Sequence, residues 1–189
     1  MAKMIEILLK EHRNIKALLL VLERELEVFD RGERPDYEIL RAVIQYFQDY
    51  PETCHHPKED LVYGKLKLRD SAAAAPVGDA EAEHRLESER LRRFAEAVES
   101  ILSEQELLRQ TVHNDVYDFI AHQREHMDKE ERLLFPAALK ALKAKDWQEI
   151  DARLSDRKDP LFDGAVEKKY QALQREIRRW EREAEAARA

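Results

Sequence analysis

Histidine and glutamate recur in the two halves of this chain at spacings that suit metal binding. His55 precedes Glu59 by four residues and His126 precedes Glu130 by four, so on a helix each pair lies on one face. A single histidine precedes each pair, and the pattern returns after 71 or 72 residues (55 to 126, and 12 to 84), which indicates a duplicated helical hairpin. The candidate metal ligands are His12, His55, Glu59, His84, His126 and Glu130.

These six side chains fall where the apolar stripes of their helices should continue into the core. Buried carboxylates need a charged partner or a metal, and no Lys or Arg stands at an obvious facing core position. Imidazole nitrogens combined with carboxylate oxygens suit iron, with zinc or manganese as alternatives. Two iron ions would each take two terminal histidines, and both glutamates would bridge them. Each iron would then be short of six ligands, so dioxygen, nitric oxide or peroxide could enter.

The sequence resembles the hemerythrin-like HHE cation-binding domain family over residues 1–144. The six candidate ligands carry this resemblance, together with His-His-Pro-Lys-Glu-Asp at 55–60 and His-Met-Asp-Lys-Glu-Glu-Arg-Leu-Leu-Phe-Pro at 126–136. The resemblance implies a non-haem, oxo-bridged di-iron protein that binds or reacts with dioxygen, nitric oxide or peroxide, in oxygen carriage, sensing or stress protection. The alternative within the family is an enzyme that removes peroxide or repairs damaged iron centres.

Two other classes of metal protein have part of this pattern. Ferritin-like di-iron bundles place Glu three residues before His and add a lone Glu from each of two other helices. Here His precedes Glu by four residues, and the lone residues are histidines. The stretch His122-Gln-Arg-Glu125-His126 spells the H-x-x-E-H signature of inverzincin peptidases. A zinc peptidase of that kind would leave the histidines of the first three helices without a role.

Three neighbours of the candidate ligands need separate treatment. His122 lies one turn before the ligand on its helix, so it is either a fifth imidazole ligand or, more simply, a hydrogen-bonding group just above the site. His56 follows His55 and should point about 100° away, which makes it a ligand only if the next proline distorts the turn. Glu131 should likewise point about 100° away from Glu130.

The composition favours an all-α fold. The 189 residues include only four Gly and six Pro, and 39% are charged, whereas sandwiches and barrels need many turn residues. Apolar positions at helical spacing predict a first helix that ends near Gly32, a second that Asp36 caps, and a third from about Ala80. Long helices with short connections indicate an up-down-up-down four-helix bundle.

Other local signals concern the second and fourth helices. Pro51 and Pro57 should kink or break the second helix, while the chain stays helical beyond them. Residues 70–79, which are rich in alanine, should form the main connector. Ser103 with Glu106 has the form of a capping box, which predicts that the fourth helix starts there.

The chain divides into a bundle domain, residues 1–144, and a C-terminal helical extension, residues 145–189. One stripe of the extension advances by fours and threes, which predicts a helix that packs on the bundle or on a partner. The protein is accordingly expected to be a monomer, or a homodimer through this helix. The stripe consists of Val166, Tyr170, Leu173, Ile177, Trp180 and Ala184.

Charge and hydropathy limit the partners and the location. The net charge of −7 comes without a basic stripe, so nucleic acid is not an expected partner. No apolar run approaches the ~20 residues of a membrane span, and the N-terminal stretch reads as a helix and not as a signal peptide. The single Cys54 excludes a disulfide within the chain. We therefore expect a cytoplasmic protein whose partner is a small gaseous or peroxide ligand.

Overall fold

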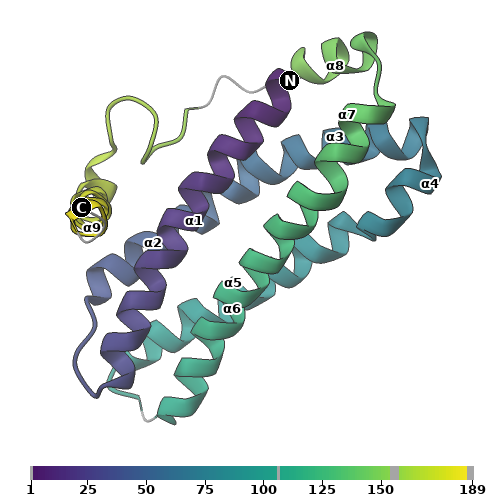
Figure 1. Ribbon diagram of the computed structural model, residues 1–189. Helices are drawn as coiled ribbons and strands as arrows, with labels where there is room; N and C mark the ends of the chain where they lie inside the picture. Colours follow the sequence, from purple (N-terminus) through teal and green to yellow (C-terminus); the bar gives the residue numbers. More distant parts are fainter. Residues whose placement is uncertain (1, 106, 154–157, 187–189) are drawn as a thin grey trace.

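The computed structural model describes residues 2–105, 107–153 and 158–186, and the fold of these residues is all-helical, without strands (Figure 1). The predicted all-α class is confirmed. The helices are α1 (Lys3–Asp30), α2 (Tyr37–Tyr50), α3 (His56–Arg69), α4 (Ser71–Ala74), α5 (Ala80–Leu102), α6 (Arg109–Lys129), α7 (Phe135–Ala141), α8 (Ala144–Asp151) and α9 (Gln171–Ala186).

Side-chain caps and one glycine set several helix ends, as the sequence predicts. Gly32 follows α1 in the left-handed region, at φ 80°, where glycine has no steric penalty. The Asp36 carboxylate accepts hydrogen bonds from the backbone N–H groups of Glu38 and Ile39, which otherwise lack helical partners. Asp79 caps α5 in the same way. The connector over residues 70–79 is shorter than expected, because α4 and a 3-10 turn (Ala75–Val77) occupy most of it.

The predicted start of the fourth helix at Ser103 is wrong. Ser103 ends α5, since its backbone N–H donates to the Glu99 carbonyl, and Glu104 then takes a positive φ of 56°. The helix α6 begins only at Arg109, after Leu108 in extended conformation. Glu106, the other half of the predicted capping box, lies outside the described residues. A capping-box pattern is local, and it cannot reveal that the preceding helix already extends to this serine.

The prolines of the second helix change its geometry without ending it. A π-helical turn, Pro51–His55, joins α2 directly to α3. A second π-helical turn, Glu130–Leu134, joins α6 to α7 in the same way. Such turns insert an extra residue into the helix, so they shift the direction in which the following side chains point. Each turn contains one candidate metal ligand, His55 in the first and Glu130 in the second.

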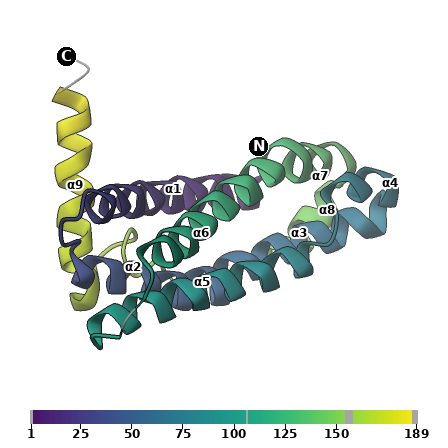
Figure 2. The same ribbon diagram turned by 90° about the horizontal axis from the view of Figure 1, so that it is seen from below.

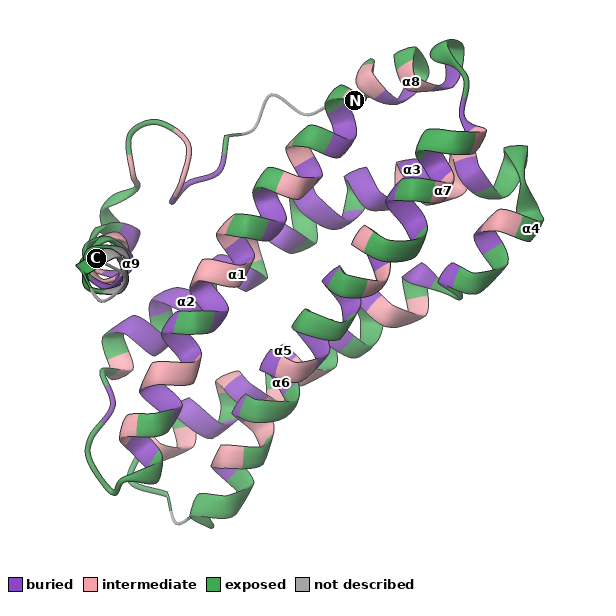
Figure 3. Ribbon diagram, in the orientation of Figure 1, coloured by how far each residue is buried: buried purple, intermediate pink, exposed green. Residues whose placement is uncertain are grey.

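The long helices lie side by side and bury one face each (Figure 3). Helix α5 packs against α6 and α2, α1 packs against α6, and α3 packs against α7. The apolar core consists of two clusters, one built from the C-terminal part of α1 with α2, α5 and α6, the other from the start of α1 with α3, α7 and α8. The candidate ligands stand between the two clusters along each helix, so a polar layer divides the core.

Helix α9 lies across the long helices and not along them (Figure 2). It contacts α1 and α2, and Leu173, Ile177 and Trp180 are buried there, together with Tyr170 just before the helix. The side chain of Ala184, the last member of the predicted stripe, lies outside the described residues.

The segment before α9 is held by the buried Asp159. Its carboxylate accepts hydrogen bonds from the hydroxyl of Tyr46, at 2.9 Å, and from the amide of Asn14, at 3.3 Å. It also accepts the backbone N–H of Leu161, at 2.9 Å. This single buried side chain therefore connects the chain beyond α8 to both α1 and α2.

Within the described residues, no helix has both the length and the apolar character to cross a bilayer.

Candidate metal centre

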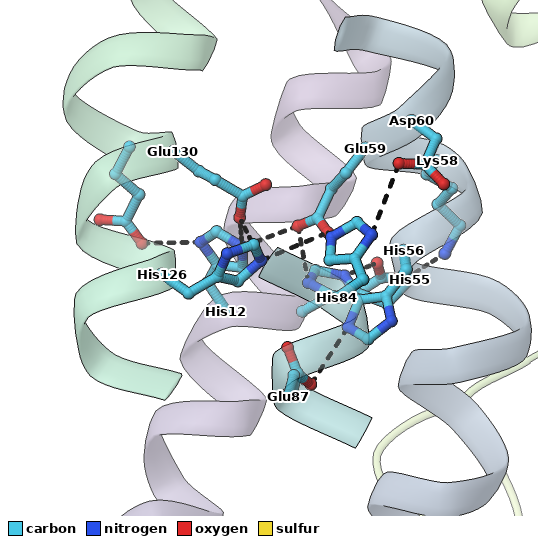
Figure 4. Close-up of polar contacts among 12 residues, drawn as sticks. His12, His55, His56, Lys58, Glu59, Asp60, His84, Glu87, His126 and Glu130 are labelled. Carbon is cyan, nitrogen blue, oxygen red and sulfur yellow. Dashed lines mark hydrogen bonds and ion pairs between the residues drawn. The ribbon is translucent and has the colours of Figure 1, made fainter. Parts of the chain in front are cut away.

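The structure brings all six candidate ligands into one buried cluster (Figure 4). Helices α1, α3, α5 and α6 contribute one of them each, and the two π-helical turns contribute the others, His55 at the end of the first and Glu130 at the start of the second. Every one of the six is at most 8% exposed, and His12 and Glu59 are fully buried.

Glu59 lies at the middle of the cluster. Its Oε1 is 2.8 Å from Nε2 of His55 and 3.2 Å from Nε2 of His12. Its Oε2 faces the other way, 3.5 Å from Nε2 of His84 and 4.0 Å from Nε2 of His126. The two oxygens of one carboxylate therefore face two different pairs of histidines.

Glu130 connects the same pairs from the opposite side. Its Oε2 is 3.3 Å from Nε2 of His12 and 3.5 Å from Nε2 of His126. The potential ligand atoms form two groups, each with all its atoms within 4.8 Å of one another. One group contains His12, His55 and Glu59, and the other contains Glu59, His84, His126 and Glu130.

Several of these atoms are buried without a hydrogen-bond partner, namely Oε2 of both glutamates and Nε2 of His84 and His126. An unsatisfied buried polar atom costs about 1–3 kcal/mol, and more when it is charged. All four atoms point into the space between the two carboxylates, where a cation would satisfy them together. The residues of the centre therefore fit bound metal, by donor type and by arrangement.

Without a cation, protons hold the centre together. Burial alone would lower the pKa of His12, but hydrogen bonds to Glu130 and Glu59 raise it to about 9. Burial likewise opposes the charge of His55, but the charge of Glu59 and hydrogen bonds to Glu11 and Glu59 raise its pKa to about 10. The carboxylates that attract one proton to each ring would attract a divalent cation more strongly.

The pKa values of Glu59 and Glu130 are shifted in opposite directions. Burial tends to raise the pKa of each, but the charge of His55 and hydrogen bonds with the histidines hold the pKa of Glu59 well below its usual range. Burial and the neighbouring charge of Glu59 raise the pKa of Glu130 well above its usual range. Burial lowers the pKa of His126 to about 4, so this ring is neutral at pH 7. Two adjacent carboxylates cannot both stay ionised without added positive charge.

A carboxylate outside the cluster holds the far nitrogen of His55. Oε2 of Glu11 is 2.9 Å from Nδ1 of His55, and its Oε1 accepts hydrogen bonds from the hydroxyl of Tyr50 and from Nζ of Lys58. All of these side chains are buried. Lys58 is thus a buried cation that the sequence pattern did not reveal, and it pairs with Glu11 and not with Glu59 or Glu130.

Glu131 is outside both groups of ligand atoms but contacts one of the rings from the outer side. Its Oε1 is 2.9 Å from Nδ1 of His12 and 2.7 Å from Nζ of Lys16. The sequence pattern did not predict this contact. The only sequence signal for these outer contacts is an acidic residue beside every candidate ligand except His55, which is common in so acidic a chain.

His56 and His122 lie next to the cluster and belong to neither group of ligand atoms. Nε2 of His56 is 3.2 Å from Oε1 of Glu87, and its ring stacks on His84 with centroids 4.2 Å apart. His122 is buried one turn from the cluster, and its Nε2 has no hydrogen-bond partner. Glu125 is exposed, so the base of an inverzincin site would face away from the two histidines of that motif.

The fold and the centre define a class of helical protein that binds metal cations in its core through histidine and glutamate. Comparison with family models matches residues 3–138 to the hemerythrin HHE cation binding domain. The chain belongs to this family, and the resemblance seen in the sequence is confirmed. Comparisons with curated proteins and with solved structures return no match.

Proposed function

We propose that the protein holds two metal ions, with His12 and His55 at one position, His84 and His126 at the other, and Glu59 and Glu130 between them. The observation that carries this proposal is the placement of Glu59, whose two oxygens face the two pairs of histidines. In this proposal α1, α2 with α3, α5, and α6 with α7 are the four members of an up-down-up-down bundle.

We propose iron as the metal, because imidazole nitrogen and carboxylate oxygen together suit it. Bound iron supplies electrons and an open coordination position to a small molecule. The chain itself holds the cations in place, limits access of water by burying every proposed ligand, and supplies the negative charge that retains them. Zinc and manganese are the alternatives.

The proposed ligand is dioxygen, nitric oxide or peroxide. Four histidines and two bridging carboxylates would leave each ion short of six ligands, so a small molecule could complete the coordination. Reversible binding would serve carriage, sensing or stress protection. Catalytic turnover would instead indicate an enzyme that removes peroxide or repairs damaged iron centres. A zinc peptidase is disfavoured by the exposure of Glu125.

The test is metal analysis with an optical spectrum on protein purified from iron-replete cells. We expect two irons per chain and the absorption of a magnetically coupled di-iron pair. One metal ion per chain, or zinc with no affinity for iron, would contradict the proposal. Addition of peroxide under multiple-turnover conditions then distinguishes the enzyme, which consumes many equivalents, from the carrier, which changes its spectrum once.

We further propose that the protein acts as a monomer in the cytoplasm. The apolar face of α9 is already buried against α1 and α2 of the same chain, which favours packing on the bundle over pairing with a second copy. Size-exclusion chromatography with light scattering checks the oligomeric state.

A further inference from the structure

We infer that the two metal positions bind with unequal affinity, and that the position of His12 and His55 fills first. This inference rests on the proposed function, because it concerns the same centre. The internal duplication provides the comparison: positions around the first site have counterparts 71 or 72 residues away around the second (11 to 83, and 58 to 129).

The first comparison concerns the pair of a glutamate and a lysine that lies beside each proposed metal position. Glu11 and Lys58 form a pair whose side chains are 7% and 8% exposed, and Glu11 also holds Nδ1 of His55 at 2.9 Å. The duplicated pair is Glu83 with Lys129, whose atoms are 2.9 Å apart with side chains 29% and 27% exposed. The same pair is thus buried in one half and partly solvated in the other.

The duplicated pair does not hold a histidine. Among the residues that the structure describes, His126 forms ion pairs only with Glu59 and Glu130, both through Nε2. Tyr50, which donates a hydrogen bond to Glu11, has Ala121 as its counterpart, so the third member of the buried network is absent from the second half.

The second comparison concerns the lone histidines, and the two halves exchange carboxylates here. Glu131 of the second half holds Nδ1 of His12 at 2.9 Å, and Lys16 holds Glu131 in turn. Asp60 of the first half, its counterpart, lies 3.5 Å from Nδ1 of His84. A separation of 3.5 Å is at the limit of a hydrogen bond. The side chain of Asp60 is also 45% exposed.

These contacts fix the rings of the first position before metal arrives. A carboxylate on Nδ1 keeps the proton on that nitrogen, so an arriving metal displaces only the proton on Nε2 and binds an oriented, more basic ring, which raises metal affinity. Loss of such an outer partner typically costs 10–100-fold in metal affinity. Both histidines of the first position have a close outer carboxylate, whereas neither histidine of the second has one at 2.9 Å.

The experiment is an anaerobic titration of the metal-free protein with ferrous ion against a chromophoric chelator. We expect two phases of one equivalent each in the wild type, separated by at least about 10-fold in affinity. Glu11→Gln should weaken the tighter phase by about 10–100-fold and leave the weaker phase unchanged. Glu83→Gln, the duplication-matched control, should leave both phases unchanged.

One further variant and one matched pair of variants protect the test against a folding defect. Tyr50→Phe keeps the Glu11–Lys58 pair and should weaken only the tighter phase, by a smaller factor. His126→Ala should retain the tighter equivalent, whereas His55→Ala, its duplication-matched partner, should lose it.

One phase of two equal equivalents in the wild type would overturn the inference. So would a Glu83→Gln variant that weakens the tighter phase as much as Glu11→Gln does, or a loss of the tighter equivalent in His126→Ala. Failure to bind any iron would instead overturn the proposed function, so the two outcomes are distinguishable.

Discussion

Glu59 is the residue on which we expect the centre to depend most, because among the ion pairs of the described residues its two oxygens face the two different pairs of histidines, whereas Glu130 contacts both pairs through one oxygen. Glu59→Gln replaces one of these oxygens by an amide NH₂, which cannot bind a cation. We expect the metal affinity to fall by more than the 10–100-fold that loss of an outer partner costs. Glu125→Gln, on an exposed site of α6, is the control and should keep full metal content in the same elemental analysis. Equal loss in both variants would contradict the bridging role.

Glu25, far from the centre, gives a prediction about pH. Burial raises the pKa of Glu25, although a hydrogen bond from the backbone N–H of Asp36 opposes the rise. The folded state therefore binds this proton more tightly than the unfolded state does. The stability that Glu25 contributes is fully present below its unfolded pKa of about 4.3 and is lost as the pH rises through its folded pKa.

At pH 7 the ionised carboxylate of Glu25 is buried, which costs stability. Glu25→Gln removes this cost, and its side-chain oxygen can still accept the hydrogen bond from the backbone N–H of Asp36. We expect the variant to melt about 1–4 °C above the wild type at pH 7, for a gain of about 1 kcal/mol or less. The advantage should disappear near pH 4. Thermal melts of the two proteins across that range check it, and a constant difference at every pH would contradict the account.

At the residue scale, the sequence was sufficient to find the six clustered side chains, because duplication repeats them and helical spacing orients them. It was insufficient for Glu11, Lys58 and Glu131. Their roles depend on contacts between helices. Lys58 and Glu11 are 47 residues apart in the sequence, and Glu131 and His12 are 119 apart. No periodicity within one helix reports such pairs.

At the scale of elements, the caps can be tested separately from the metal. Asp36→Ala removes the acceptor of two backbone N–H groups at the start of α2, and should cost about 1 kcal/mol and 2–4 °C of Tm. Ser103→Ala should change the stability by no more than about 0.5 kcal/mol, since Ser103 follows the end of α5 and does not cap α6. Metal content should stay the same in both. A larger loss of stability from Ser103→Ala would indicate that Ser103 does cap a helix, and would contradict the start of α6 at Arg109.

Helix boundaries set by one side chain or one glycine were predicted well, at Gly32, Asp36 and Ala80. The π-helical turns were not predictable in kind, although a distortion at Pro51 was. A π-helical turn forms where the packing of the whole helix accommodates one extra residue, and no residue type or spacing marks such a turn in a sequence. These turns contain His55 and Glu130, so their geometry helps to set how two of the six candidate ligands point.

For the whole molecule, binding and folding should be coupled. Closing the core around two carboxylates without a cation leaves unsatisfied buried atoms, so metal should stabilise the folded state. A ligand at 100 times its Kd adds about 2.7 kcal/mol for one site. We expect the iron-loaded protein to melt about 5–10 °C above the metal-free protein in scanning calorimetry. Equal melting temperatures would argue against ligands in the core.

The C-terminal segment should matter for stability and not for metal. Truncation after Arg153 keeps α8, whose Asp146 binds Arg69 with atoms 2.8–3.0 Å apart, and removes Asp159 and α9. The truncated protein lacks the apolar side chains that cover α1 and α2, namely Tyr170, Leu173, Ile177 and Trp180. Burial of each large apolar side chain contributes about 1.5–3 kcal/mol to the free energy of unfolding. We expect a lower Tm and lower solubility with an unchanged iron spectrum. Loss of all iron from a truncated protein that stays folded would show that this segment closes the centre.

The exchange of carboxylates between the two halves has a consequence for synthesis. The partner of His12 on Nδ1 is made 119 positions after His12, and Glu130 comes just before that partner. A nascent chain that has produced only the first hairpin holds three of the six proposed ligands, His12, His55 and Glu59, and His12 lacks both contacts from the second half. The finished centre can form only after the ribosome has passed residue 131. Metal can therefore meet the whole set of proposed ligands only after this point of synthesis, and chains made while metal is scarce should fold without it and be less stable.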